Sequence, residues 1–339
     1  MSDAPFALGS LPRHGGALAE AETRFGRPAE GWMDLSTGIN PFAYPLPPLA
    51  AAVWQRLPDA DAVAAVQVAA AAAWSVPDPD WIVAAAGSQA VLQMLPLLRP
   101  PSTVAVVGPT YSEYAECWSQ AGHRVIPCPA PEEVGDAEVV VVCNPNNPDG
   151  RRFDPARLRG LARSLEPRGG VLIVDEAFGE LAPELALTAS AGPGLVVLRS
   201  LGKFFGLAGL RLGFAVCDPA AAALLRRSLG PWPVNGVALA VGAVALADTA
   251  WIAEMRAKLE REAAVLDALL GDFGLAVAGG TSLFRLVGAP RAWALYEHLA
   301  ARGILVRPFA QQPRWLRFGL PADDAARARL ADALAAWNA

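Results

Sequence analysis

The sequence predicts an α/β domain with a mostly parallel central sheet, accompanied by a smaller α+β domain. The first reason is length, because 339 residues exceed the roughly 100–200 of a typical single domain. The second is composition, since 53% hydrophobic and 18% charged residues are typical of a globular protein. The third is that short apolar runs alternate with longer helical segments from residue 81 onward.

The predicted strands of the larger domain are continuous apolar runs. Such runs are typical of parallel strands that helices cover on both faces, because neither face then meets water. The runs are 81–85, 103–107, 139–143, 171–174, 195–198 and 212–216, and the predicted helices between them are 88–98, 112–121 and 155–164.

After about residue 217, long helical segments replace this alternation. We expect helices at 237–246, 250–270, 291–301 and 323–337, and strands at 275–278, 282–286, 304–307 and 315–319. The predicted organisation is an N-terminal arm over 1–45 that returns to the smaller domain, a large domain over 46–220, and a small domain over 221–339.

Charge and hydropathy argue against several partners. The net charge is −5 and no run of Lys and Arg is longer than a pair, so neither nucleic acid nor a membrane is an expected partner. The start lacks the basic and apolar regions of a signal peptide, and the most apolar stretch, 62–76, is too short to span a bilayer. We therefore expect a soluble, cytoplasmic protein.

No metal site or disulfide framework is expected. The four cysteines lie far apart without C-x-x-C spacing, and the chain has only three histidines. We interpret the cysteines as small buried hydrophobic residues.

Polar residues follow five of the predicted strands, at the sheet edge where ligands bind in open α/β sheets. Gly87, Ser88 and Gln89 follow the first strand, where the N–H groups of a helix start can face an anion. Tyr111 follows the second strand, either as a ring that stacks on a flat cofactor or as a core tyrosine. The third strand leads into the rigid turn N-P-N-N-P-D-G over 144–150, which includes Asn147.

The last two strand ends carry a carboxylate and a lysine. Asp175 ends the fourth strand, where a buried carboxylate needs a cation. Lys203 follows the fifth strand, between Gly202 and two phenylalanines, and partial desolvation there favours the neutral amine that forms an imine. Ser200 and Arg211 can converge on a phosphate. A solvent-exposed loop is the common alternative for any one lysine, but it leaves the ordered set of strand ends unexplained.

The order of these motifs resembles the fold-type I enzymes that use pyridoxal 5′-phosphate (PLP), within the class I/II aminotransferase superfamily. The motifs are G-S-Q, P-T-Y, N-P-N-N-P-D-G, V-D-E-A-F, S-L-G-K and G-L-R-L-G, and the likeness covers nearly the whole chain. The resemblance implies the aspartate aminotransferase fold of PLP-dependent transferases, PLP as the cofactor, and a homodimer with shared active sites.

The resemblance also assigns roles to residues. Lys203 would carry PLP as a Schiff base, Asp175 would bind the pyridine nitrogen and Tyr111 would stack on the ring, which makes these three the implied catalytic residues. Asn147 would bind the phenolic oxygen. The residues that would hold the cofactor phosphate are Gly87, Ser88, Gln89, Ser200 and Arg211.

Two C-terminal segments resemble the substrate-binding parts of the family. The strand at 315–320 resembles the one that grips the substrate carboxylate, with Arg317, although an arginine in that pattern alone is more often on a solvated face. The segment 303–307 resembles the one that presents an arginine, here Arg307, to a substrate phosphate.

The N-terminal arm resembles threonine-phosphate decarboxylases of cobalamin biosynthesis. His14-Gly15-Gly16 precedes D-L-S-T-G-I-N-P over 34–41, where histidinol-phosphate aminotransferases usually have N-E-N-P. The implied reaction converts L-threonine O-3-phosphate to (R)-1-aminopropan-2-yl phosphate and CO2. An arm without a ligand is the alternative for the histidine. The implied substrate-binding residues are His14, Gly38, Asn40, Arg307 and Arg317.

Other functions stay open at this point. The reaction depends on which bond of the substrate Cα stands perpendicular to the PLP ring, and the residues do not give that torsion. The first alternative is a histidinol-phosphate-like aminotransferase, and the second is a non-catalytic PLP-binding protein. A nucleotide-binding module is a third, but no G-x-G-x-x-G motif or P-loop follows a strand.

Two positions depart from the family pattern. Asp149 stands where the asparagine motif usually ends in Asn-Pro-Thr-Gly, which brings a negative charge toward the cofactor edge unless the side chain points to solvent. Leu57 precedes Pro58-Asp59 where many relatives have a tyrosine that reaches the partner subunit's PLP phosphate, so this contact cannot support the implied dimer.

Overall fold

The computed structural model describes residues 12–338, and contacts divide the chain into two compact units. The large unit is 42–256, and the small unit combines the residues up to 41 with those from 257 onward. The boundary expected near residue 220 lies inside the large unit. The reason is that α7 (Pro219–Leu229) packs against strand β2 (Ile82–Ala85), and α8 (Gly236–Ala247) packs along α3 (Ala60–Trp74).

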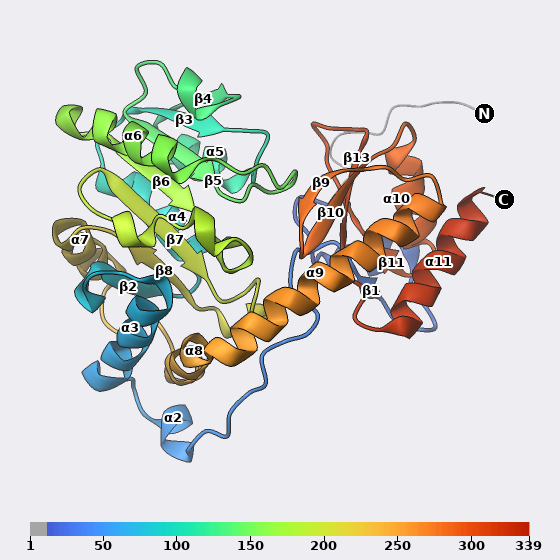
Figure 1. The fold of residues 1–339 in the computed structure, drawn as a ribbon, viewed down its shortest axis with the longest axis horizontal. Helices are drawn as coiled ribbons and strands as arrows, with labels where there is room; N and C mark the ends of the chain where they lie inside the picture. Colours follow the sequence, from blue (N-terminus) through green and yellow to red (C-terminus); the bar gives the residue numbers. More distant parts are fainter. Residues whose placement is uncertain (1–11, 339) are drawn as a thin grey trace. The chain divides into compact units, whose positions relative to one another are not determined.

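The large unit is built on a seven-stranded sheet with the order β2-β8-β7-β6-β5-β3-β4 (Figure 1). Neighbours from β7 to β4 are all parallel, and β8 alone runs against both of its neighbours. This confirms the predicted mostly parallel sheet. The other strands are β3 Thr103–Val107, β4 Arg124–Cys128, β5 Val139–Cys143, β6 Val171–Asp175, β7 Leu195–Ser200 and β8 Gly213–Val216.

The core of the large unit is formed by the apolar runs that predict its strands. Every residue of β5 and β7 is buried, as expected of strands without a solvent face. Strand β4 was not predicted because it is the outermost strand of the sheet, with Arg124 and Pro127 exposed. The helices between the strands are α4 Ser88–Met94 with a 3₁₀ turn over Leu95–Leu98, α5 Glu113–Gln120 and α6 Pro155–Leu165.

The helices before and after the sheet complete the large unit. A short helix, α2 (Ala51–Gln55), precedes α3, and side-chain caps such as Asp59 on α3 satisfy helix-start N–H groups. A long helix, α9 (Thr249–Asp272), continues from the large unit into the small one. Over residues 12–338, no single helix has the length and hydropathy to cross a membrane; α8 and α9 reach them only as a pair bent by 78°.

The small unit contains two sheets. A four-stranded antiparallel sheet has the order β12-β13-β10-β9, and a parallel pair joins β1 of the arm to β11. Strands β9 and β10 each begin two residues later than predicted. The strands are β1 Met33–Asp34, β9 Val277–Thr281, β10 Phe284–Gly288, β11 Ile304–Leu305, β12 Arg307–Pro308 and β13 Trp315–Gly319, and the helices are α1 Leu18–Phe25, α10 Ala292–Ala300 and α11 Asp324–Asn338.

Candidate active site

The residues predicted to bind a cofactor all lie at one edge of the large-unit sheet. Parallel strands present their carboxyl ends at the same edge, and β8, which is antiparallel, begins there. Asp175 closes β6, Ser200 closes β7, and Lys203 follows three residues later. The other members are Gly87, Ser88 and Gln89 after β2, Tyr111 after β3, Asn147 after β5, and Arg211 before β8. The topology therefore gathers residues that are more than 100 positions apart in the sequence.

The turn after β2 and the residue before β8 form a cradle for an anion. Gly87 has a φ of +82° and precedes α4, and a Cβ atom there would lie 2.8 Å from the Arg211 guanidinium. Arg211 itself has a left-handed φ of +53°, a rare conformation for a residue with a side chain. A glycine is therefore required for the arginine to approach the start of α4. Helix N–H groups and a guanidinium at the same place are suited to a phosphate.

Tyr111 and Gln89 form the side of the site next to this cradle. The Tyr111 hydroxyl donates to Gln89 Oε1 at 3.3 Å, and Gln89 Nε2 donates to Glu113 Oε2 at 3.2 Å. The ring of Tyr111 meets Tyr114 edge-on, with centroids 5.4 Å apart. These contacts fix the orientation of the Tyr111 ring at the end of β3.

Asp175 is buried and held from two sides. Its Oδ1 accepts from the Ala177 N–H at 2.8 Å, and its Oδ2 accepts from the Tyr114 hydroxyl at 2.8 Å. Burial raises the pKa of Asp175, against the opposing effects of those two hydrogen bonds and of the charges on Lys203 and Arg199. A carboxylate in this environment is stabilised by an adjacent cation, and a protonated pyridine nitrogen is one. Tyr114, which sequence reasoning missed, also has its pKa raised by burial and by Asp175.

The raised pKa of Asp175 predicts a pH dependence of stability. The folded state, without PLP, keeps the proton of Asp175 at a pH where the unfolded chain, with an ordinary pKa near 3.8, has lost it. The contribution of Asp175 to the free energy of unfolding is therefore complete below that ordinary value. It falls by about 1.4 kcal/mol per pH unit up to the raised folded pKa, and is flat above it.

Denaturant unfolding of the cofactor-free protein and its Asp175→Asn variant, measured from pH 3.5 upward, isolates this contribution. We expect the free energy of unfolding of the wild type to fall, relative to that of the variant, as the pH rises. A difference that is constant across the range would contradict a protonated Asp175.

The asparagine turn after β5 is held by Asp149. Asn146 accepts from the Thr110 hydroxyl at 2.7 Å and donates to Asp149 Oδ1 at 2.7 Å. Asp149 also pairs with Arg151 at 2.7 Å, and Arg151 donates to the Gly108 carbonyl at 2.8 Å. The unusual carboxylate is thus used within the protein, where it joins the turn that carries Asn147 to the loop before Tyr111.

A cluster of buried, ion-paired side chains lies beside Asp175 and Ser200. Arg199 donates to Glu176 at 2.8 Å and to Glu180 at 2.6 Å, and all three side chains are buried. Glu176 adjoins Asp175 and Arg199 adjoins Ser200, so the cluster ties the end of β6 to the end of β7. The cluster was not predicted from the sequence. Its visible signals are E-A-F-G-E directly after one predicted strand and an arginine at the end of the following strand.

In the small unit, the two predicted substrate arginines face each other. Arg307 of β12 and Arg317 of β13 are directly opposite in the antiparallel pair. Burial and, to a smaller extent, the charge of Arg307 lower the pKa of Arg317 to about 9, against the opposing charge of Asp34. Like charges that face each other across a sheet are destabilising unless an anion binds between them. This pair is therefore a candidate site for an acidic substrate.

The other predicted substrate residues lie on the arm beside this pair. Arg307 donates to the backbone carbonyls of Pro12 and Arg13, the two residues before His14. Arg317 donates to the Ser36 carbonyl at 2.6 Å. Buried residues of the segment that follows Ser36 include Gly38 and Asn40. The structure thus places the whole predicted set within the small unit.

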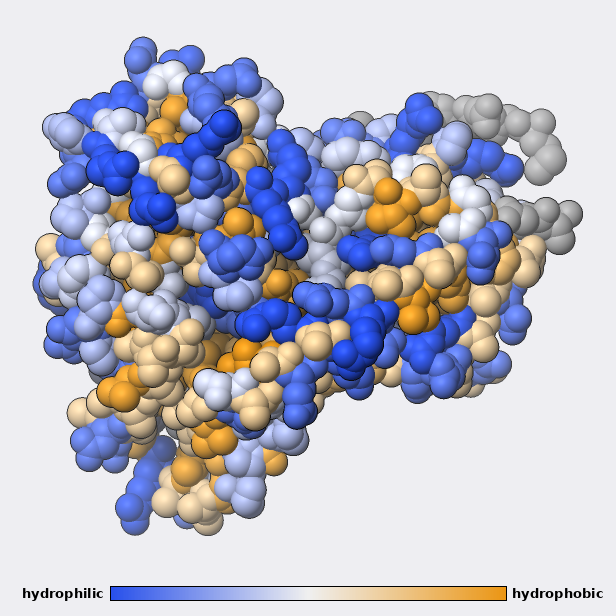
Figure 2. Space-filling view, viewed as in Figure 1, coloured by the Kyte–Doolittle hydropathy of each residue, from blue (hydrophilic) through white to orange (hydrophobic). Residues whose placement is uncertain are grey.

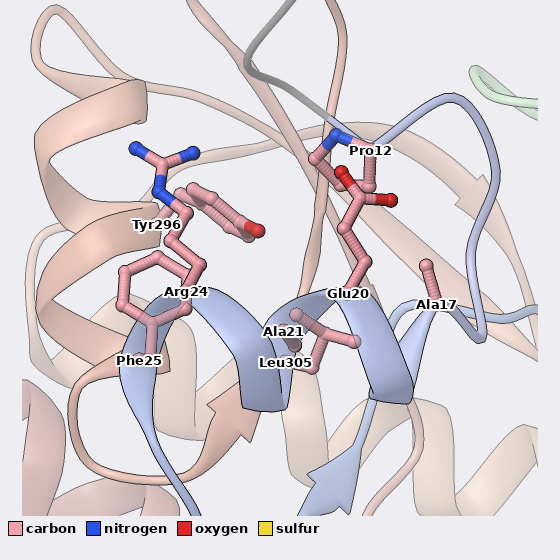
Figure 3. A pocket seen from close by; sticks show the side chains of 8 residues that line it. All are labelled: Pro12, Ala17, Glu20, Ala21, Arg24, Phe25, Tyr296 and Leu305. Atoms are coloured by element: carbon pink, nitrogen blue, oxygen red, sulfur yellow. The ribbon is translucent and has the colours of Figure 1, made fainter.

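A small pocket lies beside α1 (Figure 3). It is lined by residues of α1, by Tyr296 of α10, by Leu305 of β11, and by Pro12 and Ala17. None of the predicted substrate residues lines it.

Comparison with known proteins assigns the class. The family Aminotransferase class I and II matches residues 31–334, and the chain belongs to this family. Enzymes of the family depend on PLP, which confirms the predicted cofactor. The fit is visible in the residues, since the large-unit edge offers an anion cradle, a buried carboxylate that needs a cation, an aromatic ring and a lysine.

Two relatives are more specific. The chain is 44% identical to a threonine-phosphate decarboxylase of Pseudomonas aeruginosa, over 95% of this chain and 96% of the relative. It is 46% identical to a threonine-phosphate decarboxylase of Sinorhizobium sp, over 95% and 97%. Among solved structures, the histidinol-phosphate aminotransferase of Sinorhizobium meliloti in complex with PLP has a TM-score of 0.82, with 24% identity and 99% of both chains covered. This likeness confirms the predicted aspartate aminotransferase fold.

Proposed function

We propose that this chain is a PLP-dependent carboxy-lyase that converts L-threonine O-3-phosphate to (R)-1-aminopropan-2-yl phosphate and CO2 in cobalamin biosynthesis. The observation that carries the proposal is the facing pair Arg307 and Arg317. A substrate with a carboxylate and a phosphate brings two anionic groups to two guanidinium groups. Identity of 44% and 46% to two threonine-phosphate decarboxylases supports the same substrate.

In the large unit, the strand-end residues would hold the cofactor. Lys203 Nζ would attach to the PLP aldehyde, Asp175 would accept a hydrogen bond from the pyridine nitrogen, and Tyr111 would lie on the ring. Bound there, PLP supplies an acceptor for the electrons that remain when a bond at the substrate Cα breaks. Asn147 would bind the phenolic oxygen. The phosphate would be held by Gly87, Ser88, Gln89, Ser200 and Arg211.

In the small unit, the arginines would orient the substrate. Arg317 would bind the carboxylate, and Arg307 with the arm residues His14, Gly38 and Asn40 would bind the phosphate. A firmly held phosphate restricts rotation about Cα, and this restriction selects the bond that is broken. Lys203 would then deliver a proton to Cα from Nζ.

An aminotransferase of histidinol phosphate would use the same cofactor residues. The two reactions differ in whether CO2 or a proton leaves Cα, so the discriminating result is CO2 release without an oxo acid. The arm favours the decarboxylase, because an early H-G-G is followed by D-L-S-T-G-I-N-P, which reads T-G-I-N-P where the aminotransferases usually have N-E-N-P. The intact Lys203, Asp175 and Arg317 also favour an enzyme over a non-catalytic PLP-binding protein.

We also propose a homodimer that works in the cytoplasm. Leu46, Trp54, Leu57 and Trp232 of the large unit are 57–68% exposed, and apolar residues gather over α2, α3 and α8 (Figure 2). Exposed apolar area of this kind is typical of a surface that a second subunit covers. All four cysteines are unpaired thiols, as in a reducing compartment. The mass of the holoenzyme in solution tests the dimer.

A further inference from the structure

Gly15 and Gly16, near the start of the arm, pack onto Ser36 further along the same arm. A Cβ atom on Gly15 would overlap the Ser36 carbonyl oxygen, and Gly16 has a φ of +79°. Only glycine allows both the close approach and the left-handed turn. The two glycines of the H-G-G motif are therefore explained by a docking contact.

The Ser36 hydroxyl is fixed in one orientation. It donates to Asp34 Oδ1 at 2.5 Å and accepts from the Gly16 N–H at 2.7 Å. The Ser36 N–H also donates to Asp34 Oδ1, at 2.8 Å. Because Ser36 is only 2% exposed, water cannot replace these partners if the hydroxyl is removed.

Ser36 and Arg307 hold residues 12–16 of the arm at two points, with His14 between them. The Ser36 carbonyl accepts from Arg317 at 2.6 Å, and Arg317 faces Arg307 across the sheet. Arg307 in turn donates to the carbonyls of Pro12 and Arg13. The contacts therefore form a closed circuit from Arg307 through the arm to Ser36, and from Ser36 through Arg317 back to Arg307.

We propose that Ser36 is a positioning residue for recognition of the substrate phosphate, which it serves by fixing residues 14–16 of the arm, and with them His14, to one point of the small unit. The inference rests on the proposed function and deepens it. A phosphate is a stronger acceptor for Arg307 than the neutral carbonyls of the arm, so a bound substrate takes over those donors. The Ser36 contact is then what keeps His14 beside the phosphate.

The test is the Ser36→Ala holoenzyme, compared with Ser282→Ala in the β9–β10 turn of the same unit. We expect Ser36→Ala to raise the KM for L-threonine O-3-phosphate about tenfold, the effect of one buried hydrogen bond, with kcat within about twofold of wild type. The PLP content and the kcat/KM for unphosphorylated threonine should not change. Gly15→Ala, which disturbs the same contact by a clash, should give the same pattern, while Gly288→Ala, with open space around it, should not.

Calorimetric binding of L-threonine O-3-phosphate and of inorganic phosphate separates this inference from the proposed function. If wild type does not decarboxylate the substrate, the proposed function fails. Weaker phosphate binding by Ser36→Ala than by wild type would still support the role of Ser36. An unchanged preference for the phosphorylated over the plain amino acid in Ser36→Ala would overturn the inference. So would an equal loss of PLP and of kcat, because that loss indicates a general structural role.

Discussion

Replacement of Lys203 by alanine is expected to abolish turnover and the visible absorbance of the bound cofactor. The chain has only two lysines, Lys203 and Lys258, and Lys203 alone follows a strand at the ligand edge of the sheet. Among residues 12–338, no other amine follows a strand at that edge to form the covalent link to PLP. Lys258→Ala is the matched control and should keep both activity and absorbance.

The small number of lysines also permits a direct chemical test. Borohydride reduction of the holoenzyme fixes the cofactor on the lysine that carries it, and peptide mapping then has two candidates to separate. We expect the label on the peptide that contains Lys203. A label on Lys258, or visible absorbance that survives in Lys203→Ala, would contradict the assignment of the cofactor site.

Replacement of Arg307 by alanine is expected to act on phosphorylated substrates alone. A hydrogen bond to a charged group contributes about 1.5–3 kcal/mol, so kcat/KM for L-threonine O-3-phosphate should fall by roughly one to two orders of magnitude. Plain threonine makes no use of this guanidinium and should lose little. Steady-state kinetics with both substrates measures the ratio.

Arg314→Ala is a suitable control, because Arg314 is exposed and lies just before β13. It should leave the kinetics of both substrates unchanged. Equal losses for threonine and its phosphate in Arg307→Ala would remove Arg307 from the phosphate site and leave the facing arginines without their proposed ligand.

The large-unit sheet is predictable because its strands are buried on both faces. Such strands have no polar side, so they are visible as continuous apolar runs, and the residues after them fall at one edge by topology alone. Strand β4 shows the limit of this reasoning. It lies at the sheet edge and includes exposed Arg124 and Pro127, so no apolar run marks it.

Contacts between distant segments are what the sequence does not reveal. Tyr114 is three residues from the predicted Tyr111, yet its hydroxyl holds Asp175, 61 positions away. Asp149 departs from the family pattern in the sequence, and only the structure shows that it pairs with Arg151 and accepts a hydrogen bond from Asn146. These residues have ordinary sequence patterns, and only the packing of helices and turns on the sheet gives them partners.

The central claim is that the substrate loses CO2, and it is tested most directly with carboxyl-labelled L-threonine O-3-phosphate. The holoenzyme is incubated with PLP and without any oxo acid, and released CO2 and the amine product are both measured. We expect one CO2 for each aminopropanol phosphate formed, and none with Lys203→Ala. No release of labelled CO2, with the label kept in an oxo-acid product once 2-oxoglutarate is supplied to accept the amino group, would contradict this and identify an aminotransferase.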